Sequence, residues 1–467
     1  MRKYFFLLLL SVCGLGSAIA QNQYWEYPGI NFNNGIRVMY YDSVTEKSYI
    51  GGSFIQVDGS PCKLLVYDGQ SYTPFPVPPP AGLGSLRSIV RYHDKLYVCG
   101  YGATLASWDG TAWDIIDTGS YFNLRVWNDK LYAMGFYDTA STVLKYGGIG
   151  VWNDTVWTGL LGIDSIVSSG GNAIDDIAFY KGKVYVGGNW HNAAKPWLSD
   201  FMMHDGQGWQ QVGNWGGSGM GNVNRLLVWR DTLYVAGAFT ESPVVPGNGI
   251  AAWDGQEWHR LQRGVRDPSE AGTAVFDLNI YQDELWVAGF FSIINGRYVN
   301  DNYGKVAKWN GSQWCTMDTW LLGGAYGIGR WKDELFLLGG FYLPEDFSKR
   351  ILLKWTGGSY TDTCNQDFTV GVDGFDKGNR LKIQCYPNPH KEQFILSFVN
   401  NRSLASGKKL ILELIDVTGS VRSRLQHKLV HGKNEILINT EALQPGIYSI
   451  RLLADGVVIG TLKVVKQ

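Results

Sequence analysis

Between residues 37 and 360 the chain alternates hydrophobic and polar positions in short segments separated by tight turns. One unit consists of apolar segments at 226–229, 233–237 and 250–253 and a short fourth segment at Trp258. Asp254-Gly255 separates the last two segments, and such a pair favours a two-residue hairpin because Gly adopts positive φ without strain. The pattern predicts four antiparallel strands in each unit.

The unit recurs seven times, and an aromatic residue marks its second segment each time. These residues are 35 to 53 positions apart, and they are Tyr49, Tyr97, Tyr132, Tyr185, Tyr234, Trp286 and Phe336. This period is typical of propeller blades of four strands. An open sandwich or a solenoid fits less well, because seven copies match a closed ring, which leaves few strand edges exposed. Residues 21–364 are therefore predicted to be all-β and to form a seven-bladed β-propeller.

The repeats resemble two groups of known proteins. Glycine pairs end the second segment at 51–52, 187–188 and 339–340, as in kelch-type and galactose-oxidase-type propellers. An L-Y-V-G-G-x-F … W-D-G-x-x-W signature resembles that of bacterial repeat proteins. These resemblances imply a fold and no activity, and no copper ligand of galactose oxidase can be matched to a residue here. Trp25 resembles an extra outer-strand aromatic that would complete the last blade, a role that Tyr360 could also fill.

The N-terminus predicts export. Arg2 and Lys3 precede an apolar run, and the small residues at 18–20 form a cleavage site, so residues 1–20 are expected to be a signal peptide. The run is too short for a membrane-spanning helix, and no transmembrane segment is predicted elsewhere.

The C-terminal end carries an ordered set of motifs. Tyr386-Pro387-Asn388-Pro389 opens the region, a Pro-Gly-Ile-Tyr run with Gly446 and Tyr448 follows, and Lys463 and Lys466 make the end basic. Residues 382–467 resemble the type A C-terminal sorting domain of the type IX secretion system. The resemblance implies a small immunoglobulin-like β-sandwich that the secretion machinery recognises at the outer membrane. It also implies removal of the domain on translocation, often with linkage to surface lipopolysaccharide. The protein is thus expected outside the cell or on the outer-membrane surface, after transit through the periplasm. The polar, glycine-bearing residues 365–381 are predicted to be a linker.

Charge balance and cysteine spacing limit the partners and sites that the chain is expected to have. The 41 Lys and Arg residues balance 42 Asp and Glu residues, which argues against a nucleic-acid partner. Five cysteines follow the signal peptide, none spaced as C-x-x-C, so neither a zinc nor a redox site is indicated: Cys62, Cys99, Cys315, Cys364 and Cys385. Cys315 and Cys364 occupy similar places in successive repeats and could pair in an oxidising compartment.

The variable loops gather on one face of the predicted ring, where a repeated scaffold usually binds its ligand. Aromatic rings stack on the C–H faces of sugars, so the candidate ligand-binding residues are Trp190, His191, Trp197, Trp215, Tyr298, Tyr303 and Trp320. The alternative is that these side chains pack the loops against the ring, since large aromatics are often buried.

Catalytic motifs are sparse, and no catalytic residue, cofactor or metal site is predicted. The seven histidines are scattered, without metal-ligand spacing or a nucleophile elbow. Asp175-Asp176 could be a paired carboxylate site, although hydrogen bonding to backbone amides explains the pair as well. The aspartates before glycine, Asp109, Asp205 and Asp254, are expected to cap turns. The recurrent tryptophans are expected to pack between blades: Trp108, Trp113, Trp152, Trp157, Trp253, Trp258, Trp309 and Trp314.

These features predict non-catalytic binding of a glycan or a protein at the cell surface. One alternative is an extracellular glycoside hydrolase or polysaccharide lyase that uses carboxylates in the same loops. Another is a structural or adhesion component without a small ligand.

Overall fold

The computed structural model describes residues 25–80, 82–168, 172–215, 222–243, 245–267, 273–298, 305–316, 322–342, 349–357, 383–386, 388, 390–400, 409–416, 420–430, 432–454 and 457–466. The chain divides into two compact units, residues 1–367 and 368–467. The predicted signal peptide and linker lie outside the described residues. Within the described part, no helix has the length and apolar character needed to cross a bilayer.

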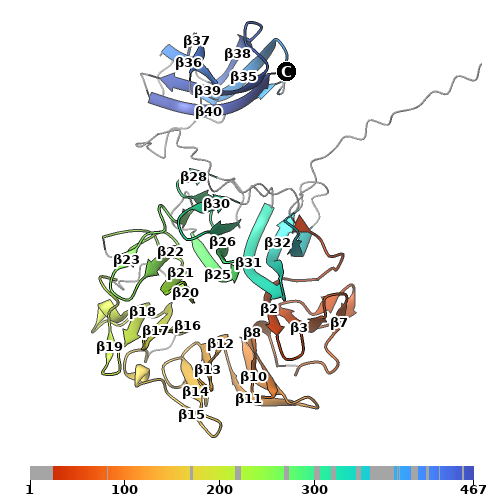
Figure 1. The fold of residues 1–467 in the computed structure, drawn as a ribbon, viewed down its shortest axis with the longest axis vertical. Coiled ribbons are helices and arrows are strands. Elements are labelled where there is room, and N and C mark those ends of the chain that lie inside the picture. The colour runs from red at the N-terminus through yellow and green to blue at the C-terminus, as the bar shows by residue number, and fades with distance from the viewer. Residues whose placement is uncertain are drawn as a thin grey trace, which may run out of the picture. The chain divides into compact units, whose positions relative to one another are not determined.

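Seven four-stranded antiparallel sheets, one for each repeat, contain most of the strands in the described part of the N-terminal unit (Figure 1). The first three are β2 (Ile36–Asp42), β3 (Lys47–Gly52), β6 (Leu64–Tyr67) and β7 (Tyr72–Pro74); β8 (Ser85–Tyr92), β9 (Lys95–Tyr101), β10 (Ala103–Trp108) and β11 (Trp113–Gly119); and β12 (Tyr121–Trp127), β13 (Lys130–Gly135), β14 (Ile149–Trp152) and β15 (Trp157–Thr158). The next three are β16 (Ala173–Tyr180), β17 (Lys183–Asn189), β18 (Phe201–His204) and β19 (Trp209–Gln210); β20 (Val223–Trp229), β21 (Thr232–Gly237), β22 (Ile250–Trp253) and β23 (Trp258–His259); and β25 (Ala274–Tyr281), β26 (Glu284–Phe290), β29 (Lys305–Trp309) and β30 (Trp314–Thr316).

The seventh sheet combines the two ends of this unit. It contains β31 (Leu322–Trp331), β32 (Glu334–Tyr342), β33 (Lys349–Trp355) and the N-terminal strand β1 (Trp25–Glu26). Trp25 pairs with Trp355, which confirms that Trp25 joins the last repeat. Tyr360, the alternative, lies outside the described residues.

Short elements occupy the loops. They are the strand pair β4 (Gln56–Val57) and β5 (Ser60–Pro61), the small sheet of β24 (Val265–Arg266), β27 (Ile293–Ile294) and β28 (Arg297–Tyr298), and two 3-10 turns, η1 (Ile163–Ser165) and η2 (Pro196–Leu198).

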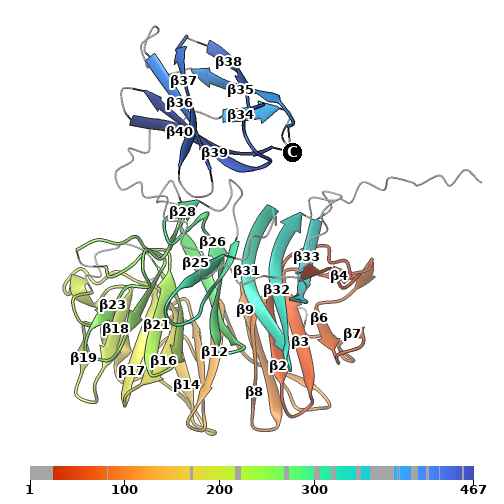
Figure 2. The ribbon, with the colours of Figure 1, turned by 45° about the horizontal axis from the view of Figure 1, so that its top comes forward.

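Among the described residues of the N-terminal unit, the core consists of seven apolar clusters, and each lies between two consecutive four-stranded sheets. Between the fifth and sixth sheets, for example, Trp229 packs near Trp309. The last cluster joins the seventh sheet to the first, through Phe336 and Met39. In Figure 2, β31 and β32 accordingly stand beside β2 and β3. The first and the last repeats are therefore neighbours in space, and each sheet buries side chains against two others.

The recurrent tryptophans have the predicted packing role. Trp253, Trp309 and Trp314 are buried between sheets. The indole N–H of the fourth-strand tryptophan also donates to a loop carbonyl of the preceding repeat, as from Trp258 to Val212 O at 3.0 Å. The aspartates before glycine cap their turns as predicted; the Asp109 carboxylate accepts hydrogen bonds from two backbone amides.

The C-terminal unit contains two antiparallel sheets. Their strands are β34 (Ile383–Tyr386), β35 (Gln393–Asn400) and β38 (Gly432–Asn439) in one sheet, and β37 (Val421–Lys428), β36 (Lys409–Asp416), β39 (Gly446–Ala454) and β40 (Val457–Lys466) in the other. Alternate residues of both sheets bury one shared core, which includes Phe394, Leu412 and Ile450. The period of two follows from strands that are solvated on one face.

The cysteines divide into two kinds. Cys62, Cys99 and Cys385 are free thiols, whereas Cys315 is disulfide-bonded. The predicted partner of Cys315, Cys364, lies outside the described residues, so their pairing stays a prediction.

Candidate functional site

In the described part of the N-terminal unit, the first strand of each four-stranded sheet carries a β-bulge near its start. The bulge leaves one residue of the first strand without a partner on the second, and these seven residues are Arg37, Arg87, Phe122, Asp175, Asn224, Phe276 and Tyr326. A bulge releases its residue from the strand ladder and redirects the side chain, and bulges are frequent beside functional sites.

A glycine on the second strand makes each bulge possible. It pairs with the residue that precedes the bulge, and the seven glycines are Gly52, Gly100, Gly135, Gly188, Gly237, Gly289 and Gly339. A Cβ atom at any of them would lie 1.9 to 2.2 Å from a backbone carbonyl oxygen near the start of the first strand. This close approach explains why a glycine ends the second segment of every repeat.

The seven bulge residues line one cavity of about 430 Å³, which we call the bulge cavity. The other described residues that line it are Tyr101, Phe136, Ala173, Asn189, Asn222 and Arg225. A second cavity of about 400 Å³ lies further along the same first strands. In Figure 1 these strands lie nearest the centre of the seven sheets, so the bulges bring residues far apart in sequence to one place.

One side of the bulge cavity is aromatic and cationic. The guanidinium of Arg87 lies 5.5 Å from the ring centre of Tyr101 and 5.3 Å from that of Phe122. Arg37 lies 4.3 Å from the ring centre of Tyr326. Contact with the negative face of a ring stabilises a guanidinium that is removed from water.

Arg87 is only partly satisfied by the protein. Its Nε is buried and has no hydrogen-bond partner among the described residues. Burial, followed by repulsion from Arg37, lowers the pKa of Arg87. Arginines further along the same strands differ, since Arg91 pairs with Asp42 at 2.7 Å and Arg125 with Asp176 at 2.6 Å.

The predicted carboxylate pair splits into two environments. Asp176 is fully buried and accepts hydrogen bonds from Arg125, from Asn123 at 2.9 Å and from the backbone N–H of Leu226 at 3.0 Å. Asp176 therefore ties three consecutive sheets together, which is the structural role that the sequence allowed.

Asp175, the bulge residue, instead faces the bulge cavity. Burial raises the pKa of Asp175 to about 7, and the neighbouring Asp176 acts in the same direction, against Arg87 and Arg225. Near neutral pH this carboxyl is therefore divided between its charged and neutral forms.

Amide groups occupy the part of the cavity contributed by the fourth and fifth sheets. Asn189, Asn222 and Asn224 line it there, and Asn224 Nδ2 donates to Val275 O at 2.8 Å. The cavity thus has an aromatic, cationic part and a part rich in amides.

Two of the predicted loop aromatics are buried, which corrects their assignment to a ligand-binding surface. Trp190 is 1% exposed, and its indole N–H donates to Leu198 O at 2.6 Å within its own loop. Trp215 is 2% exposed and packs against Phe201 and Trp258. Because both rings complete the packing of loops, neither can offer a face to a ligand.

Of the other predicted loop residues, Trp197 and His191 are the two whose side chains the structure describes. Trp197 is 49% exposed. His191 is exposed and borders a separate hollow of about 800 Å³, together with His204 and Trp209. Tyr298 lies in β28, where its side chain is not described, and Tyr303 and Trp320 lie outside the described residues.

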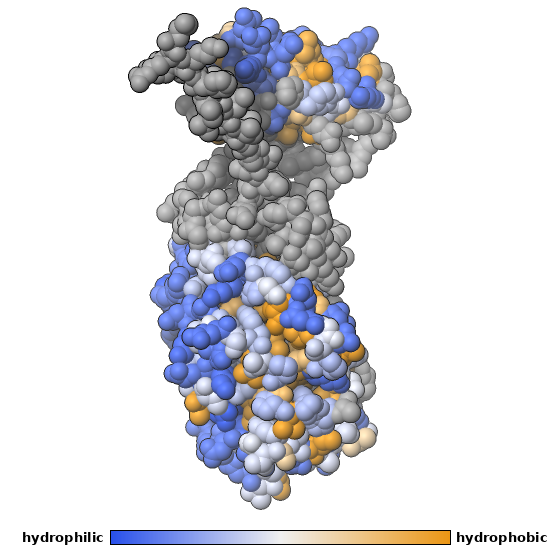
Figure 3. Space-filling view, turned by 90° about the vertical axis from the view of Figure 1, so that its right-hand side faces the viewer, coloured by the Kyte–Doolittle hydropathy of each residue, from blue (hydrophilic) through white to orange (hydrophobic). Residues whose placement is uncertain are grey.

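The outer side of the unit offers a less defined surface. Figure 3 looks onto the side that carries the first sheet, where apolar residues lie among hydrophilic ones. Exposed apolar side chains of this sheet and its loops include Ile55 and Val77. The bulge cavity is the stronger candidate because it combines enclosure with convergent polar groups.

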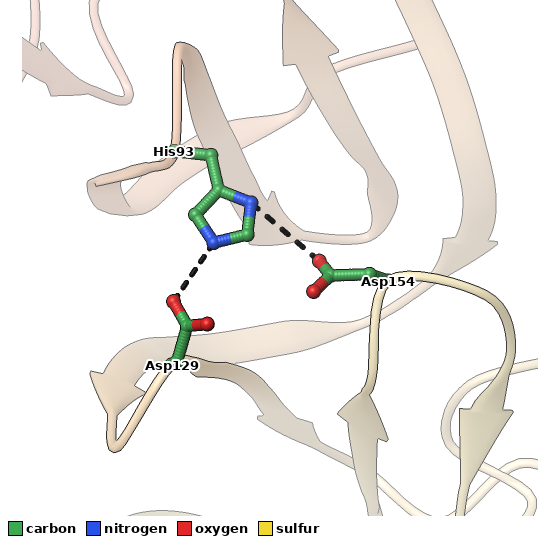
Figure 4. A group of neighbouring side chains, drawn as sticks. All are labelled: His93, Asp129 and Asp154. Atoms are coloured by element: carbon green, nitrogen blue, oxygen red, sulfur yellow. Dashed lines mark hydrogen bonds and ion pairs between the residues drawn. The ribbon is translucent and has the colours of Figure 1, made fainter.

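One cluster in the described part of the chain has donor atoms close enough for a metal ion: His93, Asp129 and Asp154. His93 Nε2 lies 2.8 Å from Asp129, and Nδ1 lies 3.6 Å from Asp154. The two carboxylates approach different nitrogens of the ring (Figure 4), which suits a protonated imidazole better than one shared ion. The hydrogen bond with Asp129 raises the pKa of His93.

Equivalent turns elsewhere carry ion pairs of the same kind. Lys181 pairs with Asp231 at 3.0 Å, and Lys332 of the seventh sheet pairs with Glu46 of the first at 2.8 Å. The His93 cluster is therefore one of several ion pairs that link consecutive sheets.

In the C-terminal unit, the signature motifs hold the last strand in place. The backbone N–H of Val465 donates to Asn388 Oδ1 at 2.8 Å, and His390 N donates to Val465 O at 2.9 Å. Lys466 is buried, and its ammonium donates to the carbonyls of Thr440 and Glu441. Its charge thus serves to anchor the C-terminal end.

The remaining motif residues have mixed positions. Tyr448 is buried, and its hydroxyl donates to Gln444 O at 2.8 Å. Tyr386 is exposed and donates to Glu435, while Gly446 begins β39. Pro387, Pro389 and the side chain of Lys463 are outside the described part of the structure.

Comparison with known families assigns this unit. Residues 384–467 match the family described as the secretion system C-terminal sorting domain. The chain therefore carries a sorting domain of the type IX secretion system and is exported to the cell surface or the extracellular space. No curated protein matches the chain.

Proposed function

We propose that the N-terminal unit is a seven-bladed β-propeller that binds a glycan in the bulge cavity at the cell surface, without catalysis. Seven four-stranded sheets, apolar clusters between consecutive sheets and the pairing of β1 with β33 support the propeller. The C-terminal unit, with two sheets around one core, is the immunoglobulin-like sandwich of the sorting domain.

The convergence of the seven bulge residues in one cavity carries this proposal. Aromatic rings such as Phe122 and Tyr326 offer flat faces to the C–H groups of a sugar, while asparagine and arginine side chains hydrogen-bond to its hydroxyls. Because each bulge is fixed by a strand pair, the side chains are positioned before the ligand arrives. Little conformational entropy is then lost on binding.

The carboxylates of the cavity favour binding over hydrolysis. A glycosidase uses two carboxyl groups about 5 to 9.5 Å apart across the scissile bond. Among the described lining residues, Asp175 alone has a carboxyl group, and its neighbour Asp176 is held by Arg125.

A glycan array with the protein that lacks only the signal peptide, residues 21–467, tests this function. Bound sugars are then checked by mass spectrometry for cleavage. Specific binding of intact sugar is expected, with affinity lowered about fivefold by Phe122→Ala, since a ring contact contributes about 1 kcal/mol. Trp197→Ala is the matched control because Trp197 is exposed and lies away from the cavity. Shortened products would establish an enzyme instead, and the absence of any glycan binding would refute the proposal.

A further inference from the structure

We infer that the bulge cavity takes an acidic sugar, a uronate whose carboxylate lies between the guanidinium groups of Arg37 and Arg87. This inference rests on the proposed glycan-binding function and adds the chemical class of the ligand.

Two arginines face the cavity without an ion pair to any described carboxylate. Ring contacts hold Arg37 over Tyr326 and Arg87 over Tyr101 and Phe122, while the charged form of Asp175 attracts Arg87 through space. Their mutual repulsion contributes to the lowered pKa of Arg87, whose buried Nε has no described partner. A carboxylate between them would relieve the repulsion and accept hydrogen bonds in the planar, two-pronged geometry that guanidinium groups prefer.

Three other arginines on the first strands of the sheets differ from Arg37 and Arg87, because they have an aspartate partner. Arg91, Arg125 and Arg225 each have an aspartate at 2.6 to 2.9 Å. These three arginines are therefore neutralised within the protein, whereas Arg37 and Arg87 at the bulges remain available to an anion from outside.

The rest of the cavity fits a sugar ring better than a bare anion. Phe122 and Phe136 pack with ring centres 4.9 Å apart near Arg87, while Phe276 and Tyr326 lie 6.0 Å apart near Arg37. Apolar faces thus stand beside each guanidinium, and the asparagine amides complete the lining with donors and acceptors for hydroxyl groups.

Asp175 makes binding sensitive to pH. It interacts with Arg87 of β8 and Arg225 of β20 and directly precedes Asp176 in β16; Arg37, Tyr101 and Tyr326 also line the cavity. Neutral Asp175 can donate a hydrogen bond to the ligand, whereas ionised Asp175 adds a negative charge beside the uronate. Since the pKa of Asp175 is about 7, affinity falls as the pH rises through neutrality.

The test compares an oligogalacturonate with a neutral galacto-oligosaccharide of equal length, by calorimetry on the protein that lacks only the signal peptide, residues 21–467. The acidic sugar should bind at least about tenfold more tightly, because charge-assisted hydrogen bonds exceed neutral ones. Arg87→Gln should abolish this preference, while Arg230→Gln, at an exposed turn, should preserve it. The affinity should weaken from about pH 6 to about pH 8, and Asp175→Asn should flatten that dependence.

The possible outcomes distinguish the uronate inference from the proposed glycan binding and from a protein ligand. Equal binding of both sugars overturns the uronate inference and leaves glycan binding intact, whereas binding of neither overturns both. Tighter binding of an oligoglutamate than of the oligogalacturonate overturns the inference in favour of a protein ligand. The comparison of the two sugars needs only the wild-type protein, so it holds even if Arg87→Gln fails to fold.

Discussion

Replacement of Gly237 by alanine tests the physical basis of the bulge cavity. A Cβ at this position would lie 1.9 Å from Asn222 O and 2.9 Å from Asn222 C, the residue directly before the first strand β20. Carbon and oxygen do not approach closer than about 3 Å without strain, so the two strands would have to separate by about 1 Å. That movement breaks the pairing around Asn224, and the substitution should lower the free energy of unfolding by about 3 kcal/mol, the upper end of typical overpacking.

Tryptophan fluorescence during urea unfolding measures this effect in the intact protein. All 19 tryptophans lie between Trp25 and Trp355, so the signal reports on the N-terminal unit alone. Gly208→Ala is the matched control, because no atom lies within 4 Å of its added Cβ. It should be neutral or stabilise by up to about 1 kcal/mol through the unfolded state. An unchanged unfolding midpoint for Gly237→Ala would show that the close approach does not constrain the fold.

Three further predictions concern packing, charge and export. Trp258→Ala should lower the free energy of unfolding by about 3 kcal/mol, since it removes a ring that packs 5.1 Å from Trp253 and 5.5 Å from Trp215 and that donates to Val212 O. Trp197→Ala should change this free energy by less than about 0.5 kcal/mol, and equal effects of the two substitutions in urea unfolding would contradict the packing role. Because the pKa of His93 is raised in the folded state, its ion pair stabilises the protein fully below the unfolded pKa of about 6.5 and loses this effect as the pH rises through the folded value. His93→Asn should therefore lower the unfolding midpoint at about pH 5.5 and leave it unchanged at about pH 8.5, and a loss of equal size at both would rule out the charge. Removal of residues 382–467 should leave a folded N-terminal unit in the periplasm when cell fractions are probed, and normal surface display would contradict the sorting role.

The repeat architecture was predictable because its signals are local. Alternating apolar segments, Asp-Gly turns and recurring tryptophans each act within one sheet or between neighbours, and Trp25 marked the strand that joins the seventh sheet. The sorting domain was equally accessible, since its motifs lie in order near the C-terminus.

The candidate site was not predictable in the same way. The seven bulge residues do not share one residue type, and a bulge depends on the register between two strands, which sequence does not display. The glycine opposite each bulge is the available signal, because every repeat has one near the end of its second segment. Trp190 and Trp215 were assigned to a binding surface because they lie in variable loops, but their size makes burial within those loops more favourable.

The seven bulge residues also lie apart from the apolar residues that pack the sheets together. Their side chains belong to none of the seven apolar clusters, and their backbones are already outside the strand ladders. A substitution at one of these positions can therefore alter what the cavity accepts with little effect on the sheets that support it. Related chains could acquire new specificities by single replacements at seven geometrically equivalent positions, while selection for stability acts on the glycines opposite them.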